Sequence, residues 1–209
     1  LDQECLYRPG IRVMSIFESI INNFNEHMDL TSRHVESLTP YIAESVNLIT
    51  ETLMAGNKIL CCTSPVSCAA GHQFCDTLLH CVDLERPALP ALLLGSDNHS
   101  NLYKLGSHKA DDIFSSQIQL FGKPGDALYV ISMDDKDKSI INAINTAQEL
   151  GINIISLTTD RQTVISSIVS NDQVNMILST QNSGQLIRLQ FLISHLLAQL
   201  TEQQLFGSH

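Results

Sequence analysis

The chain has 209 residues, a formal net charge of −10, 44% apolar residues and 16% charged residues. This composition excludes a disordered chain, and the acidic balance argues against direct binding to nucleic acid, which depends on Lys and Arg to neutralise phosphates. No apolar run reaches the ~18 residues that a membrane span needs.

The N-terminal sequence has no basic segment followed by an apolar stretch, so we expect no signal peptide and a cytoplasmic protein. The six cysteines are then expected to be reduced thiols that pack as small apolar residues. A helical pattern starts at Met14, so we interpret residues 1–13 as an extension and residues 14–209 as a single domain.

The domain opens with two predicted helices. Apolar residues recur with helical spacing up to Thr39-Pro40, which matches an N-cap followed by a first-turn proline. A second apolar stripe continues from there and stops at Gly56. The sequence therefore predicts an N-terminal helical pair over residues 15–55.

Short apolar segments and helical patterns alternate through the rest of the chain. Strands are expected at 58–62, 90–94, 126–132, 152–157 and 174–179, and helices at 67–82, 112–121, 138–150, 161–169 and 184–205. Nearly all-apolar strands separated by helices indicate right-handed crossovers and a parallel sheet covered on both faces. The predicted fold class is α/β, a five-stranded parallel sheet with helices on both faces and two extra N-terminal helices.

The last predicted helix is apolar around most of its circumference. Such a helix is buried on more than one side. One side can pack on the sheet, and we expect the other to meet a second surface, that of another subunit.

Several segments carry a family resemblance. They are Gly-Asn-Lys-Ile-Leu-Cys-Cys at 56–62, Glu-Arg-Pro-Ala-Leu-Pro at 85–90, Ser-Asp-Asn at 96–98, Gly-Asp at 125–126 and Leu-Phe at 205–206. Together with the order of elements they resemble the sugar-isomerase (SIS) domain family, both its DiaA-like, initiator-associating members and the phosphoheptose isomerases. The resemblance implies a flavodoxin-like sheet, a homotetramer and, on the DiaA-like side, binding to the replication initiator DnaA.

The first phosphosugar loop departs from the family pattern. Where the family carries Gly-Asn-Gly-(Gly/Thr)-Ser, this chain has Thr63-Ser64-Pro65-Val66-Ser67. Glycines let backbone N–H groups close on a phosphate, whereas Pro65 has no N–H and Val66 disfavours positive φ. The hydroxyls of Thr63, Ser64 and Ser67 leave weak anion binding open, and we favour the simpler interpretation that Ser67 caps the helix that follows.

The second phosphosugar loop keeps only Ser132 of the family's Ser-Thr-(Ser/Arg)-Gly-Asn-Ser. Asp134, Asp135 and Asp137 stand where a phosphate would lie. Carboxylates there repel an anion by about 1 kcal/mol per charge pair at ~4 Å in bulk water. Three aspartates could instead hold a divalent cation, but a solvated loop with Asp137 at a helix N-terminus is the favoured interpretation.

The resemblance also locates the positions of the family's catalytic pair. The glutamate of the family falls on Thr77 and its histidine on Gln190. Neither side chain transfers protons near pH 7, as aldose–ketose isomerisation requires. His195 lies five residues beyond Gln190, off the same helix face, and we assign no catalytic residue.

Cys68, His72 and Cys75 share a helix face with i, i+4, i+7 spacing. Two thiolates and an imidazole are zinc ligands, but no fourth ligand is evident, and thiols on an apolar helix face usually belong to a core. We therefore expect no metal and no cofactor.

The favoured hypothesis is a non-catalytic SIS-fold adaptor that binds the DnaA initiator. The alternative is a phosphosugar-binding protein or a sedoheptulose 7-phosphate isomerase-like enzyme with divergent loops, and a third is a subunit that completes a neighbour's site. For the adaptor, Leu205 and Phe206 are the predicted partner contacts, because two large apolar side chains end an otherwise polar segment. We give equal weight to the alternative that Leu205 and Phe206 fold back onto the protein's own subunits.

Overall fold

The computed structural model describes residues 15–80, 85–96, 110–134, 136–160, 163–170, 172–180 and 182–207. The predicted extension at 1–13 lies outside these residues, as do Cys5, Cys81 and Asp135. In chain order the elements are α1 (Ile16–Met54), β1 (Ile59–Thr63), the 3-10 turn η2 (Pro65–Ser67), α2 (Cys68–Leu79), β2 (Ala91–Leu93), the 3-10 turn η3 (Ala110–Asp112), α4 (Ile113–Phe121), β3 (Ala127–Ile131), α5 (Lys138–Glu149), β4 (Asn153–Thr159), α6 (Thr163–Ile168), β5 (Val174–Leu178) and α7 (Ser183–Phe206).

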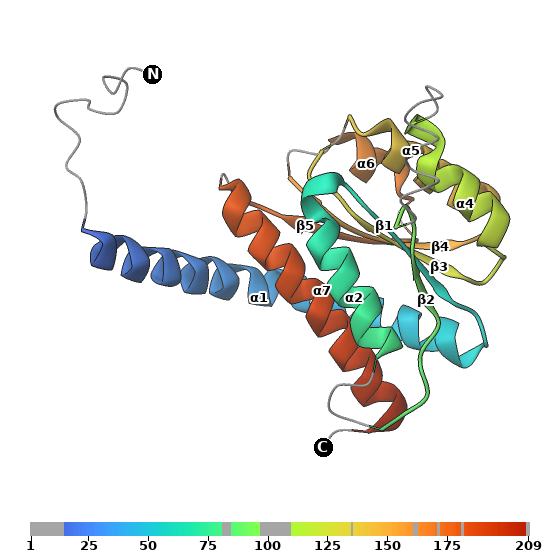
Figure 1. The fold of residues 1–209 in the computed structure, drawn as a ribbon, viewed down its shortest axis with the longest axis horizontal. Helices are drawn as coiled ribbons and strands as arrows, with labels where there is room; N and C mark the ends of the chain where they lie inside the picture. The colour runs from blue at the N-terminus through green and yellow to red at the C-terminus, as the bar shows by residue number, and fades with distance from the viewer. Residues whose placement is uncertain are drawn as a thin grey trace.

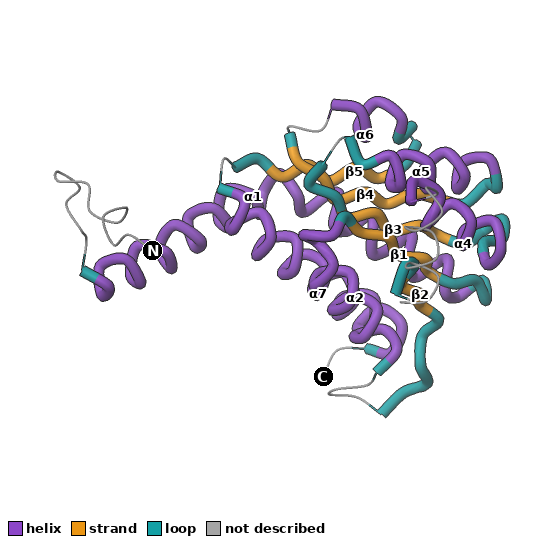
Figure 2. The backbone as a smooth tube through the Cα atoms, turned by 45° about the horizontal axis from the view of Figure 1, so that its top comes forward, coloured by secondary structure: helices purple, strands orange, loops and turns teal. Residues whose placement is uncertain are grey.

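The five strands form one parallel sheet in the order β2-β1-β3-β4-β5. This is the flavodoxin-like order, so the predicted fold class is confirmed. Helices α1, α2 and α7 cover one face, and α4, α5 and α6 cover the other (Figures 1 and 2). Within the described residues, no helix is both long and apolar enough to cross a membrane.

The two faces of the sheet carry separate apolar cores, because neighbouring strand residues point to opposite sides. In the central strand β3, Tyr129 faces α2 and α7, whereas Leu128 and Val130 face α4 and α5. Tyr129 is fully buried and packs on the Phe74 ring, with centroids 4.8 Å apart. Its hydroxyl shares a 2.9 Å hydrogen bond with the Ser194 hydroxyl, so β3, α2 and α7 meet at this side chain.

The N-terminal region is one helix, and the predicted break at Thr39-Pro40 is wrong. Helix α1 begins at a capping box formed by Ser15 and Glu18 and runs through Pro40 to Met54. The Thr39 hydroxyl donates back to the Val35 carbonyl at 2.6 Å instead of capping a new helix. Pro40 is exposed, so its missing N–H leaves the Glu36 carbonyl beside solvent, where the loss of one helical hydrogen bond is tolerated.

The N-terminal half of α1 projects from the body of the protein (Figure 1). Its apolar side chains are exposed, Phe17 at 80% and Phe24 at 69%. Ile187, Phe191 and Leu192 of α7 are also exposed. A monomer normally shows no apolar patch larger than roughly 300–600 Å², and phenylalanines offer ~150 Å² or more each, so this surface is suited to a second subunit.

We predict that the protein is a homo-oligomer, a tetramer by family resemblance, and that α1 carries part of its interface. Multi-angle light scattering at micromolar concentration should give a mass several times the 23.1 kDa of one chain. Phe17→Asp with Phe24→Asp should reduce that mass, because two buried, unpaired carboxylates oppose association. Leu120→Asp, on an exposed part of α4, is the control and should leave it unchanged. A monomeric parent protein contradicts the prediction.

Candidate functional site

The candidate site lies where β1 and β3 end. Ligands of open parallel sheets bind beyond the carboxyl ends of the strands, at the point where the strand order reverses. Here β2 and β3 flank β1 on opposite sides, so that point lies between β1 and β3. The two rewritten loops, residues 63–67 and 132–137, both start there.

A continuous chain of hydrogen bonds closes this edge of the sheet. The Met133 N–H donates to Ser64 Oγ at 3.4 Å, and the Ser64 and Ser67 hydroxyls lie 3.1 Å apart. Ser67 Oγ donates to Gln190 Oε1 at 2.8 Å, and Gln190 Nε2 donates to the Ser132 carbonyl at 3.2 Å. Since the Ser67 proton goes to Gln190, Ser64 must be the donor to Ser67. Both loops are therefore bound to α7 through the Gln190 amide.

The residues of this network are buried, so their hydrogen bonds contribute to the stability of the fold. Gln190 and Ser132 are 0% exposed, Ser67 is 1% and Ser64 is 2% exposed. A buried amide or hydroxyl without a partner costs about 1–3 kcal/mol, so each member depends on the next. Ser67 occupies the N-cap position of α2 as predicted, but its hydroxyl makes no capping bond and donates to Gln190 instead.

The backbone of the first loop is also engaged within the protein. The Ser64 N–H donates to the Ile131 carbonyl and the Ser67 N–H to the Ser64 carbonyl, both at 2.9 Å. Thr63 is buried, and its methyl group packs close to Gly71, where an added Cβ would lie 2.5 Å from it. The loop is thus folded onto β1 and β3, and the backbone N–H groups of Ser64 and Ser67 already donate hydrogen bonds to carbonyls.

In the second loop the described carboxylates bond their own segment. Asp134 Oδ1 accepts from the Lys136 N–H at 2.9 Å. Asp137 Oδ1 accepts from the Ser139 N–H at 3.0 Å and from its hydroxyl at 2.5 Å, so Asp137 is the N-cap of α5. This agrees with the predicted placement of Asp137 at a helix N-terminus.

The two positions of the family's acid–base pair differ in their surroundings. Gln190 belongs to the buried network, whereas Thr77 lies on α2 in contact with Gln73. Gln73 Nε2 donates to Thr77 Oγ1 and to His195 Nδ1, both at 3.1 Å, while the Thr77 hydroxyl donates to the Gln73 carbonyl at 2.8 Å. His195 therefore lies one side chain from Thr77 and carries its proton on Nε2. Sequence reasoning missed this contact because it tested His195 only against the Gln190 face.

The side chains of Cys68, His72 and Cys75 on α2 do not come together. Cys75 is buried against Cys61, while Cys68 and His72 are exposed. Burial, with Cys75 alongside, raises the pKa of the Cys61 thiol, and burial also raises the pKa of the Cys62 thiol. The interpretation as core thiols fits these three cysteines but not Cys68. Among the side chains that the structure describes, no group of three or more His, Cys, Asp or Glu could hold a metal.

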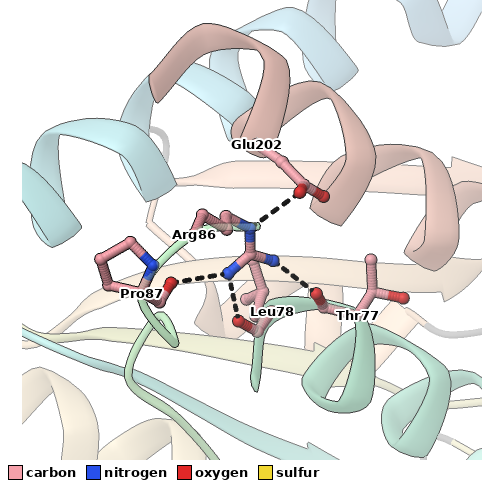
Figure 3. Close-up of polar contacts among 5 residues, drawn as sticks. All are labelled: Thr77, Leu78, Arg86, Pro87 and Glu202. Atoms are coloured by element: carbon pink, nitrogen blue, oxygen red, sulfur yellow. Dashed lines mark hydrogen bonds and ion pairs between the residues drawn. The ribbon is translucent and has the colours of Figure 1, made fainter. Parts of the chain in front are cut away.

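Arg86 forms a buried clamp near the end of α2 (Figure 3). Its Nε donates to Glu202 Oε1 at 2.8 Å, and its two terminal nitrogens donate to the carbonyls of Thr77, Leu78 and Pro87 at 2.8–3.0 Å. The bonds to Thr77 and Leu78 satisfy carbonyls in the last turn of α2, which have no partner within the helix. Arg86 thereby joins α2 to α7, a role that the Glu-Arg-Pro segment alone did not reveal.

The structure separates the two predicted partner contacts. Leu205 is half-buried against the apolar core. Phe206 is 41% exposed and lies over the Arg86 guanidinium, 5.8 Å from its carbon to the ring centroid. Leu205 thus packs onto the protein, whereas Phe206 keeps an exposed face.

A cavity of about 240 Å³ lies beside the first loop. Thr63, Pro65, Cys68 and His72 line one side, and residues 93–96 with Ile113 and Phe114 line the other. Its described lining residues include no Lys or Arg, the side chains that would favour a phosphate.

Comparison with known proteins gives a consistent result. The model of the SIS domain family matches residues 23–159. The phosphoheptose isomerase of Chromohalobacter salexigens is 29% identical over 195 residues, which are 93% of this chain and 99% of that protein. The phosphoheptose isomerase of Colwellia psychrerythraea is 29% identical over 191 residues, 91% of this chain and 97% of that protein.

Solved structures give the same fold. A phosphoheptose isomerase from Francisella tularensis superposes with a TM-score of 0.85 at 25% identity, covering 91% of this chain and all of the other. The phosphoheptose isomerase of Neisseria gonorrhoeae has a TM-score of 0.82 at 21% identity, covering 90% of this chain and all of the other. The second likeness supports the fold alone.

Removal of the Gln190 amide should destabilise the protein. Gln190→Leu removes two buried hydrogen bonds, to the Ser67 hydroxyl and to the Ser132 carbonyl, so we expect a loss of about 2–4 kcal/mol in the free energy of unfolding. Urea denaturation measures it. The control is Gln199→Leu, at an exposed position on the same helix. Its free energy of unfolding should lie within about 0.5 kcal/mol of that of the parent protein. Equal stability of the Gln190 variant and the parent contradicts the network.

Proposed function

Because this chain belongs to the SIS domain family, we propose that it is a member that has lost isomerase chemistry and acts as a binding protein. The observation that carries the proposal is the closed network from the Met133 N–H through Ser64, Ser67 and Gln190 to the Ser132 carbonyl. The hydrogen bonds among these buried polar groups would have to break before the groups could bind a substrate.

The acid–base positions support the loss of catalysis. Aldose–ketose isomerisation needs a base and an acid whose pKa values lie near the working pH. An aliphatic hydroxyl at Thr77 and an amide at Gln190 do not titrate there, and both bond neighbouring protein groups. His195, through Gln73, is the imidazole that approaches this region, and a single residue does not replace the pair.

The loops also oppose phosphate binding. Phosphate sites in such folds use several free backbone N–H groups at a helix N-terminus. Here the N–H groups of Ser64 and Ser67 are donated to carbonyls, Pro65 has none, and Asp134 and Asp137 add negative charge to the second loop. Each feature lowers the affinity for a phosphorylated sugar.

For the partner we propose a DnaA-type initiator, on the resemblance of the segments at 56–62, 85–90 and 205–206. The exposed face of Phe206 over Arg86 is the proposed contact. In a homo-oligomer several copies of this contact would act together, so weak single contacts would add by avidity.

A second candidate is a phosphosugar-binding or isomerase-like protein with divergent loops. The relatives reported above are named phosphoheptose isomerases, and this supports the second candidate better than it supports an initiator partner. The cavity of about 240 Å³ beside the first loop and the contact of His195 with Gln73 favour it as well.

Enzyme assays and calorimetry with sedoheptulose 7-phosphate separate the two candidates. We expect no turnover approaching ~1 s⁻¹, a rate at the low end for enzymes, and no saturable binding near ~10 μM, which would correspond to about 7 kcal/mol. The Colwellia psychrerythraea phosphoheptose isomerase, assayed in parallel, is the positive control. Turnover or tight binding by this chain would establish the second candidate and end the first.

The partner proposal has its own test. Phe206→Ala should reduce capture of purified DnaA-type initiator by roughly tenfold or more, since an aromatic anchor often contributes over 1–2 kcal/mol. Leu120→Ala, an exposed apolar position on α4, is the matched control. Melting temperature and oligomer size are checked first in both variants. If Phe206→Ala still captures the initiator, Phe206 is not the contact. If the parent protein captures no initiator, the initiator is not the partner.

A further inference from the structure

His34 connects the middle of α1 to the end of β5. Its Nδ1 lies 2.9 Å from the Leu30 carbonyl, one turn earlier on the same helix. Its Nε2 lies 3.1 Å from the backbone nitrogen of Ser179, the residue that follows β5. A carbonyl can only accept and a backbone N–H can only donate, so both roles of the ring are fixed.

These two bonds require a neutral imidazole with its proton on Nδ1. The neutral ring has one donor and one acceptor, whereas the imidazolium ion has two donors and no acceptor. A proton on Nε2 therefore removes the acceptor of the Ser179 N–H. This hydrogen bond between α1 and the residue after β5 is consequently available to one protonation state only.

The place of His34 in α1 makes this bond consequential. Leu30 and Leu38, on either side of His34, are buried in the core, and before Leu30 the helix projects with its apolar residues exposed. Packing beside His34 is incomplete, because a space of about 150 Å³ between α1 and α7 is lined by His34 itself with Leu38, Leu189 and Ile193. The bond from the Ser179 N–H to His34 therefore adds to the apolar contacts of Leu30 and Leu38 in fixing the helix here.

Among the residues that the structure describes, charged groups near the ring lie on α1 and directly after β4. The residues of α7 that line the adjacent space are uncharged: Leu189, Leu192, Ile193 and Leu196. Beyond β4, Asp160 Oδ2 accepts from the Ser179 hydroxyl at 2.5 Å, which brings one carboxylate to the joint. On α1 itself Arg33 and Glu36 are exposed, and Glu26 accepts from Gln185.

We propose that His34 is a proton-sensitive joint between the projecting α1 helix and the sheet. Histidine is the side chain whose charge changes most readily between pH 5 and 8. The stabilisation from the bond to Ser179 is present when the ring is neutral, at higher pH, and is lost when Nε2 gains a proton, at lower pH. Acidification from about pH 7.5 to pH 5.5 thus loosens α1 from β5. This joint does not depend on which of the two candidate functions the protein has.

Two NMR measurements test the joint on the full chain. At pH 7.5 the ¹⁵N shifts of the His34 ring should show the proton on Nδ1. The protection factor of the Ser179 amide, corrected for intrinsic exchange, should fall about fivefold or more between pH 7.5 and pH 5.5, the size expected for one lost hydrogen bond. In His34→Gln, which keeps an uncharged acceptor, the protection factor should change less than twofold.

His72→Gln is the matched control. His72 makes the same Nδ1 bond to the carbonyl four residues earlier, that of Cys68, but lies on the exposed surface of α2. This variant should keep the full pH response at Ser179. A ring proton on Nε2 at pH 7.5, constant protection at Ser179 in the parent, or the same loss in His34→Gln as in the parent would each overturn the proposal.

Discussion

The buried amide of Gln190 is the constraint on which this edge of the molecule depends. It is fully enclosed, so both ends of the amide must find partners, and they find them in Ser67 and Ser132. Those two residues belong to the loops after β1 and β3, which in this fold surround the ligand. The same amide that satisfies the loops therefore closes the space between them.

Helix α7 makes further contacts of the same kind along its length. Ser194 bonds Tyr129 of β3, His195 bonds Gln73 of α2, and Glu202 bonds Arg86. Each contact ties a different element to one helix, and apolar residues between them complete the core. A helix with a large apolar surface can still be specific, because its buried polar side chains each bond a defined partner on another element.

The sequence was sufficient for the fold because alternating strands and helices, nearly all-apolar strands and right-handed crossovers leave few topologies. It was not sufficient at Thr39-Pro40, where a local capping pattern was overridden by the packing of α1 on the core. Nor did it reveal that Ser67 bonds Gln190, or that Arg86 bonds Glu202, since 123 and 116 residues separate these partners. Contacts of that kind depend on tertiary structure and leave no local pattern.

The side-chain amide signal of Gln190 offers the most direct measurement of the central claim. In a ¹⁵N NMR spectrum its two protons should be resolved and protected from exchange, because Nε2 donates to a buried carbonyl. Addition of sedoheptulose 7-phosphate to millimolar concentration should leave its position and its exchange rate unchanged. A saturable shift, or a loss of protection as the sugar phosphate is added, would mean that the loops open to a ligand and that the site is not closed.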